Sequence, residues 1–556
     1  MAVEIVTTLN LINKELVKKI TLDELENVLF DMGFELDKLD SGELNIELTP
    51  ERLDLLSLQG FARAINSFKF GVEPKTHFKI NKSNYVVNVT SKVENVRPFT
   101  VCAVIKNLSL DDNKLEQIID IQEKLHSLLA RGRVKGAIGI YPLDKIKMPI
   151  TYSADFPDKI NFVPLGESRI FNGREILINT EKGREFAHLL NNLKMYPFFI
   201  DSNNKILSMP PIINSDLTGK VTTNTKDLFI ECSGFDKLLL NELLVNIITM
   251  LDFMGGDIYG VDVKYPNETI TYPRLEPITL TVKKDTISKL LGLSLNDNIL
   301  KNLLLKMLYS VKSINKSEII VEAPCFRRDL WHEIDVADDI ARAYGYNNFK
   351  LALPNISTIG KTLPISDLKE ELSNLLVGLN FIELYTNTLV SKKDHVNNML
   401  LGNVNFIPVI NGTENQSMMR LSILPELLNS LMNNKHISLP HRVFEVGFTI
   451  IPDKSCDVLC KNQLNLACVI ADRQVTFTQI KQVLNNVLKS KGLSCVIKPS
   501  KNPSYINGRF GLIFINDIEV GIIGEVHPEV LSNFKLFNPV ACFELNLNLL
   551  LNILEK

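Results

Sequence analysis

Four aspartates in the segment 324–348 have the spacing of a cation-binding cluster. A helix is predicted from Glu333 onward, because apolar residues recur there every three or four positions. At about 100° per residue, three of the acids share an arc of roughly 100° on that helix, while the fourth precedes it and could cap it or turn toward the others. The four acids are Asp329, Asp335, Asp338 and Asp339. Carboxylates this close need a cation among them, either Arg342 in an ion-paired helix or a hard divalent ion such as Mg²⁺.

A short basic turn offers a different chemistry. Arg131, Arg133 and Lys135 lie between a predicted helix, 115–130, and a predicted strand, 137–141. Cations grouped in this way could contact the phosphates of a nucleic acid. A solvated loop explains the same residues equally well.

Composition limits the possible classes of function. The chain has 556 residues, 45% hydrophobic and 22% charged, which is typical of a soluble globular protein with several domains. Its net charge of −3 gives no overall positive field, so contact with RNA must come from local patches or from a partner chain. The charged first twenty residues argue against a secretory signal, and the eight scattered cysteines are typical of reduced thiols. We therefore expect a cytoplasmic protein with no membrane span.

The elements that would hold these residues indicate an α+β multidomain fold. The predicted domains are 1–75, 84–267, 271–353 and 354–556. In the first, Asp54 is expected to cap the following helix and to pair with Arg52. In the second, residues 238–254 are interrupted by polar residues and predict an amphipathic helix. The third should contain two helices and hold the acidic cluster.

The acidic segment also carries a family resemblance. Over residues 327–348 it reads Arg-x-Asp, Asp-x-x-acid-acid, then Ala-Arg-x-Tyr-Gly-Tyr-Asn-Asn. This resembles the β subunits of phenylalanine–tRNA ligases, which are aminoacyl-tRNA synthetases, of the archaeal and eukaryotic cytosolic type. The resemblance implies that the four acids bind Mg²⁺ close to an α subunit. It also implies an α2β2 heterotetramer that uses ATP to attach phenylalanine to tRNA(Phe).

The same resemblance implies a domain order. It comprises an N-terminal α/β domain, a mixed α+β editing domain, a small helical or winged-type domain, and a C-terminal class II synthetase-like antiparallel sheet with flanking helices. The last of these lacks the ATP-binding signatures of its class. Glu445 stands where an arginine would bind phosphate, and Glu544 and Asn546 stand where glycines would leave room for the nucleotide. The implied adenylation site is therefore on the α subunit.

A synthetase selective for phenylalanine must also reject tyrosine, and an apolar pocket rejects an added hydroxyl only about a hundredfold. That weak discrimination motivates a second, hydrolytic site. By the resemblance, Ser208, Asn214 and Glu231 line an editing pocket in which a positioned water hydrolyses tyrosyl-tRNA(Phe). Taken alone, these residues also fit a strand end and a solvated strand. The rival interpretation is a non-catalytic tRNA-binding or scaffold subunit.

Overall fold

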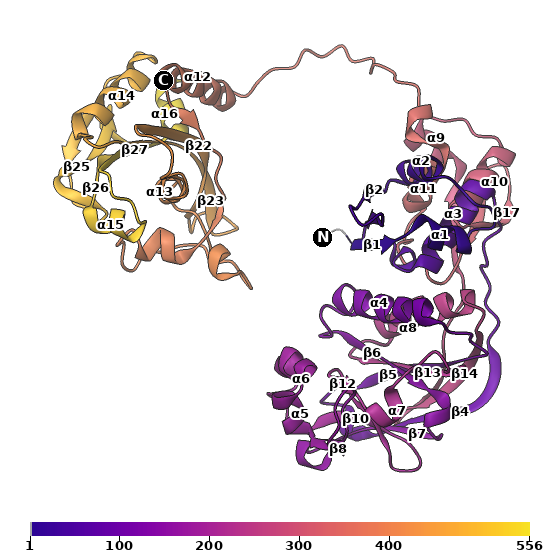
Figure 1. Cartoon of the computed structure of the whole chain (residues 1–556). Coiled ribbons are helices and arrows are strands. Elements are labelled where there is room, and N and C mark those ends of the chain that lie inside the picture. Colours follow the sequence, from indigo (N-terminus) through magenta and orange to yellow (C-terminus); the bar gives the residue numbers. More distant parts are fainter. Residues whose placement is uncertain (1–2, 556) are drawn as a thin grey trace. The chain divides into compact units, whose positions relative to one another are not determined.

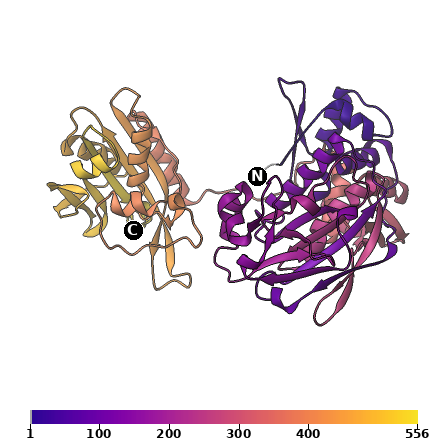
Figure 2. The same cartoon turned by 60° about the horizontal axis from the view of Figure 1, so that its bottom comes forward.

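A computed structural model describes residues 3–555 and divides the chain into two compact units, one ending at Ala352 and the other beginning at Leu353 (Figures 1 and 2). The first unit contains three larger sheets and a two-stranded one, and the second is built on one seven-stranded sheet and also has a two-stranded one. The finer division of the first unit into three domains stays a prediction. No helix among residues 3–555 is long and apolar enough to cross a membrane.

The N-terminal region is an antiparallel sheet with helices, in the order β1-β3-β2. It is therefore an α+β arrangement, and the predicted α/β arrangement of this region is wrong. Helix α2 begins with a capping box between Thr21 and Glu24 and ends at Gly33, whose φ of +83° suits glycine. The elements are β1 (Val3–Thr7), α1 (Leu9–Glu15), α2 (Leu22–Met32), β2 (Glu35–Lys38), β3 (Leu44–Leu48) and α3 (Leu58–Phe70).

The start of α3 corrects one prediction and confirms another. Ser57, and not Asp54, caps the helix, because the Ser57 hydroxyl accepts from Gly60 N. Asp54 is buried and receives two hydrogen bonds from the Arg52 guanidinium, at 2.8 and 2.9 Å. The predicted pair between Arg52 and Asp54 is thus present.

The second sheet has ten strands in the order β12-β11-β10-β7-β4-β14-β5-β13-β6, with β15 beside β14. It is mixed, because β4 runs parallel to both β14 and β7 while the other pairs are antiparallel. Its strands are β4 (Asn81–Val89), β5 (Phe99–Lys106), β6 (Gly136–Pro142), β7 (Ile150–Asp155), β10 (Tyr196–Ile200), β11 (Ile206–Met209), β12 (Ile213–Asn214), β13 (Leu228–Gly234), β14 (Asp257–Lys264) and β15 (Thr269–Tyr272). Around it lie β8 (Asn161–Phe162), β9 (Phe171–Asn172), α5 (Gly173–Asn179), α6 (Glu181–Phe186) and α7 (Asp216–Gly219).

Two helices, α4 (Asp112–Ser127) and α8 (Lys237–Phe253), pack beside this sheet (Figure 1). Helix α8 contacts β5, β13 and β6 as well as α3 and α4. From Leu240 to Leu251 every residue except Glu242 is buried. The predicted amphipathic helix is therefore a central helix covered on all sides, and its polar Asn241 bonds the Arg274 backbone instead of facing solvent.

The third sheet, in the order β16-β18-β17, is antiparallel and carries the acidic cluster on its last helix. Three helices accompany it where two were predicted. The elements are β16 (Ile278–Lys283), α9 (Lys284–Leu291), α10 (Asp297–Lys306), β17 (Ser310–Ile314), β18 (Glu318–Ala323) and α11 (Glu333–Tyr344). The start of α11 at Glu333 is as predicted, but Ile334 is half exposed while Asp339 is buried, so the buried face is rotated from the predicted one.

The second unit is a seven-stranded sheet in the order β19-β22-β23-β27-β26-β25-β24, antiparallel except for β19. Helices α12, α14 and α16 pack on one apolar face, and α13 and α15 pack on the other. The elements are α12 (Pro364–Gly378), β19 (Ile382–Glu383), β20 (Leu389–Val390), β21 (Met418–Met419), α13 (Leu424–Asn433), β22 (His441–Pro452), β23 (Cys460–Ala471), α14 (Phe477–Lys489), β24 (Val496–Pro499), β25 (Tyr505–Ile515), β26 (Ile518–Val526), α15 (Pro528–Asn533), β27 (Val540–Asn546) and α16 (Leu547–Leu554).

Candidate functional site

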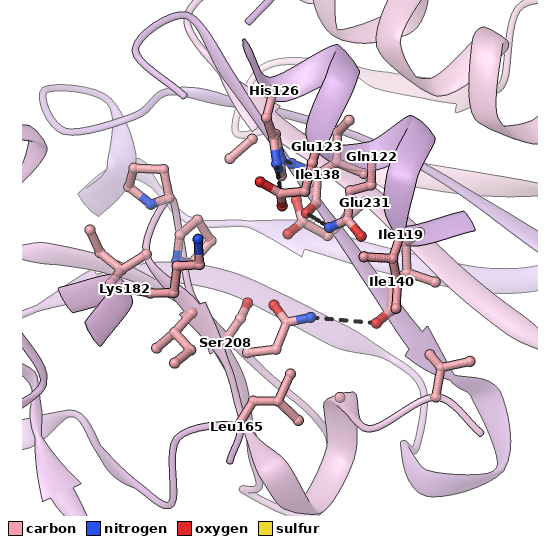
Figure 3. A pocket seen from close by; sticks show the side chains of 18 of the residues that line it. Ile119, Gln122, Glu123, His126, Ile138, Ile140, Leu165, Lys182, Ser208 and Glu231 are labelled. Atoms are coloured by element: carbon pink, nitrogen blue, oxygen red, sulfur yellow. Dashed lines mark hydrogen bonds and ion pairs between the residues drawn. The ribbon is translucent and has the colours of Figure 1, made fainter. Parts of the chain in front are cut away.

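A cavity of about 300 Å³ lies in the first unit between α4 and the ends of the mixed sheet. Ser208, Asn214 and Glu231 all line it, so the fold brings the three predicted residues to one place (Figure 3). Apolar side chains from α4 and β6 form much of the remaining wall, among them Ile118, Ile119, Ile138 and Ile140. An apolar wall with a few polar groups is the usual composition of a small-ligand pocket.

The cavity exists because the sheet curls until its two ends meet. Ser208 and Asn214 are paired across β11 and β12 at one end of the strand order, whereas Glu231 lies on β13 beside β6 at the other end. Tyr141 of β6 lies with its hydroxyl oxygen 2.7 Å from Ser208 Oγ and 3.4 Å from Asn214 Oδ1. Asn214 Nδ2 also approaches the carbonyl oxygen of Ile140, at 3.5 Å. Side chains therefore connect the two ends.

Glu231 is the most unusual polar group of the cavity. Its residue is 2% exposed, and burial raises the pKa of its carboxyl to about 8. Oε1 lies 3.2 Å from the Tyr141 hydroxyl, while Oε2 is buried with no hydrogen-bond partner among the described residues. Gly139, directly opposite on β6, makes room for this pair, because a Cβ there would overlap both the Tyr141 hydroxyl and Glu231 Oε1.

Tyr141 was not identified from the sequence as part of the site. The strand that carries it was predicted, but nothing in its neighbourhood distinguishes it from an ordinary core tyrosine. Its ring is fully buried against Phe229, at a centroid distance of 5.9 Å, and burial raises the pKa of its hydroxyl well above the usual value. Only the closure of the sheet shows that this hydroxyl contacts three polar side chains of the cavity.

The basic turn differs from its prediction. Arg131 and Lys135 are exposed, but Arg133 is buried and lines the cavity instead of presenting a third surface cation. Its guanidinium donates to the carbonyl oxygens of Pro211 and Ile212, at 3.2 and 3.0 Å, and to Glu123 Oε1 at 3.0 Å. Arg133 thus connects α4 to the loop before Asn214.

Helix α4 also closes the free edge of β6. Gln122 Nε2 donates to the Ile138 carbonyl at 2.8 Å, and the Ile138 N–H donates to His126 Nε2 at 2.9 Å. His126 is therefore occupied as an acceptor, and burial lowers its pKa. Its contact with Glu123, together with that of Arg133, lowers the pKa of the Glu123 carboxyl to about 2.

These contacts restrict the chemistry. In the cavity lining, the Ser208 hydroxyl bonds Tyr141 and His126 accepts from a backbone N–H, so these two residues do not pair as nucleophile and base. Lys182 reaches the cavity from the side opposite Ile119 and Ile140, and Lys220 also lines it (Figure 3). The arrangement suits binding of a small side chain and placement of a water molecule against a bound ester.

The four predicted metal-binding acids line a second cavity of about 800 Å³. Each already has a partner. Arg327, fully buried, donates to Asp329 at 2.7 Å and to Asp339 at 2.6 Å. Although burial opposes it, this guanidinium lowers the pKa of the Asp329 carboxyl.

The other two acids serve α11 itself. Asp335 accepts from the backbone N–H groups of Trp331 and His332, both at 2.7 Å, and so forms a capping box with the N-cap His332. Asp338 pairs with Arg342 at 3.0 Å. Asp329 therefore does not cap the helix, and Arg327 is the cation at the centre of the cluster.

As arranged here, the four acids are not grouped as metal ligands. The oxygen donors are of the kind that Mg²⁺ prefers, but no three acidic, histidine or cysteine side chains of residues 3–555 are grouped so as to hold one. The Mg²⁺ site stays a prediction.

In the second unit, one face of the sheet carries the residues that replace the nucleotide-binding signatures. Glu445, Ala467 and Glu544 are aligned across β22, β23 and β27. Glu445 is fully buried, forms an ion pair with Arg420 at 2.8 Å and accepts from the Thr386 hydroxyl at 2.6 Å. A Cβ at Gly447 would overlap Arg420, so this glycine makes room for the guanidinium.

Glu544 is also buried, and both of its oxygens are bonded. Oε1 accepts from Ile423 N and Asn465 Nδ2, at 3.2 and 2.7 Å, and Oε2 accepts from Ser422 at 2.5 Å. Burial raises the pKa of this carboxyl despite these bonds. Asn546 caps α16 by accepting from Leu549 N. Bonded protein side chains thus occupy the positions at which a nucleotide-binding site of this class would have a phosphate-binding arginine and glycines.

Comparison with known proteins agrees with the motif. A family model for the tRNA synthetase B5 domain matches residues 280–346, and one for the phenylalanyl tRNA synthetase beta chain CLM domain matches residues 350–547. The phenylalanine–tRNA ligase β subunits of Pyrococcus furiosus and Pyrococcus horikoshii are each 38% identical, over 524 and 527 residues, covering 94% of this chain and 93% of theirs. The crystal structure of an N-terminal fragment of the P. horikoshii phenylalanyl-tRNA synthetase β subunit is 36% identical, with a TM-score of 0.59, and covers 62% of this chain and 99% of the fragment. The chain therefore belongs to the phenylalanine–tRNA ligase β subunit family.

Proposed function

We propose that this chain is the editing subunit of a phenylalanine–tRNA ligase, and that the cavity lined by Ser208, Asn214 and Glu231 hydrolyses tyrosine wrongly attached to tRNA(Phe). The observation that carries the proposal is the convergence of these residues, from opposite ends of one curled sheet, on a single cavity with a buried carboxyl. A volume of about 300 Å³ can hold an aromatic side chain.

Glu231 supplies the selectivity. A phenol hydroxyl that reaches this carboxyl gains a hydrogen bond, whereas a phenyl ring leaves the buried polar group without one. Asn214 and Ser208 provide further hydrogen-bonding groups across the cavity. Because Ser208 and His126 do not pair as nucleophile and base, the reaction is hydrolysis by a positioned water, with the tRNA orienting the ester.

The second unit supports a division of labour with an α partner. A triphosphate in the position of Glu445 and Glu544 would meet two buried carboxyls, and the guanidinium beside them, that of Arg420, is already paired with Glu445. Adenylation and attachment of phenylalanine therefore belong to the α chain of an α2β2 assembly, and this chain supplies a class II-like framework. Purified alone, it should produce no aminoacyl-tRNA.

A hydrolysis assay on the complex with α tests the proposal. The wild type should hydrolyse tyrosyl-tRNA(Phe), and Asn214→Ala or Glu231→Gln should slow this about ten- to a hundredfold, the cost of leaving a buried polar group without its hydrogen bond. Glu322→Gln is a matched control, because Glu322 is a buried glutamate of the same unit that pairs with Lys312 outside the cavity. Unchanged rates in both cavity variants would remove the assignment.

A non-catalytic tRNA-binding subunit is the alternative. Arg131 and Lys135 favour it, because both are exposed on the turn beside the cavity. Binding of tRNA that falls on Arg131→Ala, with no hydrolysis by the wild type, would support this alternative.

A further inference from the structure

The junction between the two ends of the mixed sheet has no backbone ladder among the described residues. Strand β6 pairs only with β13, and β12 pairs only with β11. The spacing between the polar groups of the cavity therefore depends on side chains that cross the junction. Two do so on the β6 side: Arg133 reaches Pro211 and Ile212, and Tyr141 reaches Ser208 and Asn214.

Tyr141 is the deeper of the two crossings and the one that touches Glu231. Its hydroxyl oxygen lies 2.7 Å from Ser208 Oγ and 3.2 Å from Glu231 Oε1, and the residue is fully buried. A hydroxyl has one hydrogen and two lone pairs, so it can donate to the carboxylate while it accepts from Ser208. The result is a continuous chain of hydrogen bonds, from Ser208 through Tyr141 to Glu231, across the junction.

We propose that Tyr141 is a positioning residue of this cavity, whose hydroxyl fixes Glu231 at one end of the sheet against Ser208 and Asn214 at the other. The proposal rests on the proposed editing function. A site that reads one hydroxyl must hold its polar groups within about 0.5 Å of the productive geometry. A phenyl ring at position 141 keeps the packing against Phe229 but removes the hydrogen bond between the Tyr141 hydroxyl and Glu231 Oε1.

Tyr141→Phe should therefore reduce the preference for tyrosyl-tRNA(Phe) over phenylalanyl-tRNA(Phe). The expected loss in the ratio of kcat/KM values is about tenfold, the usual worth of one hydrogen bond in a buried site. The assay uses the complex with α and both preloaded tRNAs, measured from pH 6 to 9.

The pH profile separates positioning from simple packing. The hydrogen bond from Tyr141 favours the charged form of Glu231, so its removal should move the inflection near pH 8 upward. The other titratable groups that act on Glu231 are Arg97, Cys102, Tyr152 and Cys232, and the variant leaves them in place. A purely structural role would lower all rates without moving this inflection.

Tyr196→Phe is the matched control. Tyr196 is a buried tyrosine of the same sheet, on β10, but it does not line the cavity and is not among the groups that act on Glu231. It should keep the selectivity of the wild type.

Gly139→Ala gives an independent perturbation, because the added methyl would displace the Tyr141 hydroxyl and Glu231 Oε1 without removing either. It should also lower selectivity. If Tyr141→Phe keeps both the selectivity and the pH inflection while Glu231→Gln loses activity, the inference about Tyr141 is wrong and editing stands. If the wild type hydrolyses neither substrate, editing itself is wrong, and the role of Tyr141 falls with it.

Discussion

Glutamates are buried in more than one sheet of this molecule, and the mixed sheet of the first unit and the seven-stranded sheet of the second do so differently. In the first unit, Glu231 lies beside a cavity with one oxygen unbonded. In the second unit, Glu445 Oε1 also makes no hydrogen bond but forms an ion pair with Arg420 at 2.8 Å, and Glu544 has both oxygens bonded. Burying a carboxyl is unfavourable unless it is paired and hydrogen-bonded. In the second unit, groups of the protein compensate the cost of burying the carboxyls. In the first unit, one oxygen of Glu231 is left for a ligand to bond.

A glycine accompanies the carboxyl in both places. Gly139 makes room for the Tyr141 hydroxyl beside Glu231, and Gly447 makes room for Arg420 beside Glu445. In both sheets a glycine makes room for the group next to the carboxyl, but that group differs. It is a neutral hydroxyl in one sheet and a guanidinium in the other. The difference teaches that a buried carboxyl marks a functional site only where its partners leave it incomplete.

The largest effect on stability is expected when the cation that pairs with a buried carboxyl is removed. Arg420→Ala leaves Glu445 buried without its cation and should lower the free energy of unfolding of the second unit by about 3–5 kcal/mol. Chemical denaturation of the full chain measures it. Arg442→Ala, an exposed arginine of the same region, should have almost no effect. A loss below about 1 kcal/mol for Arg420→Ala would mean that this pair is not needed, and the contrast with Glu231 would fail.

A smaller effect is expected from pH, because the free energy of unfolding of the first unit should depend on the protonation of Glu231. Between pH 4.5 and about 8 the folded chain holds a proton on Glu231 that the unfolded chain releases. Stability should therefore fall as pH rises through this window, by about 1.4 kcal/mol per pH unit at most, and should level off above it.

Glu231→Gln cannot titrate, so its melting temperature should lack this contribution. The difference between wild type and variant across pH isolates Glu231 from Arg97, Tyr141, Tyr152 and the two neighbouring cysteines, Cys102 and Cys232. Parallel curves for the two proteins would show that burial does not raise the pKa of this carboxyl.

The smallest effect on stability is expected in the acidic cluster, whose carboxyls bond to other groups of the protein, as the buried carboxyls of the second unit do. Asp335→Ala removes a capping box and should cost about 1 kcal/mol. Asp338→Ala removes only a surface pair with Arg342 and should cost about 0.3–0.5 kcal/mol.

Trp331, the only tryptophan of the chain, is 85% exposed and donates its backbone N–H to Asp335, so its fluorescence reports on this cluster. We expect no change on adding Mg²⁺ to the chain alone, because each acid is already paired. A Mg²⁺-dependent change that Asp335→Ala abolishes would support the predicted metal site.

Local sequence patterns were sufficient for much of the secondary structure. The helix starting at Glu333 and the Arg52–Asp54 pair depend on neighbours within a few residues, and each was predictable. The cap of α3 was assigned to Asp54 instead of Ser57, because both polar residues precede the helix and only backbone geometry distinguishes them.

The family, and with it the three cavity residues, could be read from motifs along the chain. What the linear sequence could not show was which partner each charged side chain would find. Three arginines are buried against carbonyl or carboxylate groups that lie 10 or more residues away or on other strands, namely Arg133, Arg327 and Arg420. Such pairs follow from how sheets curl and helices pack, and only the tertiary structure decided them, as it decided that the hydroxyl of Tyr141 lies where the two ends of one sheet meet.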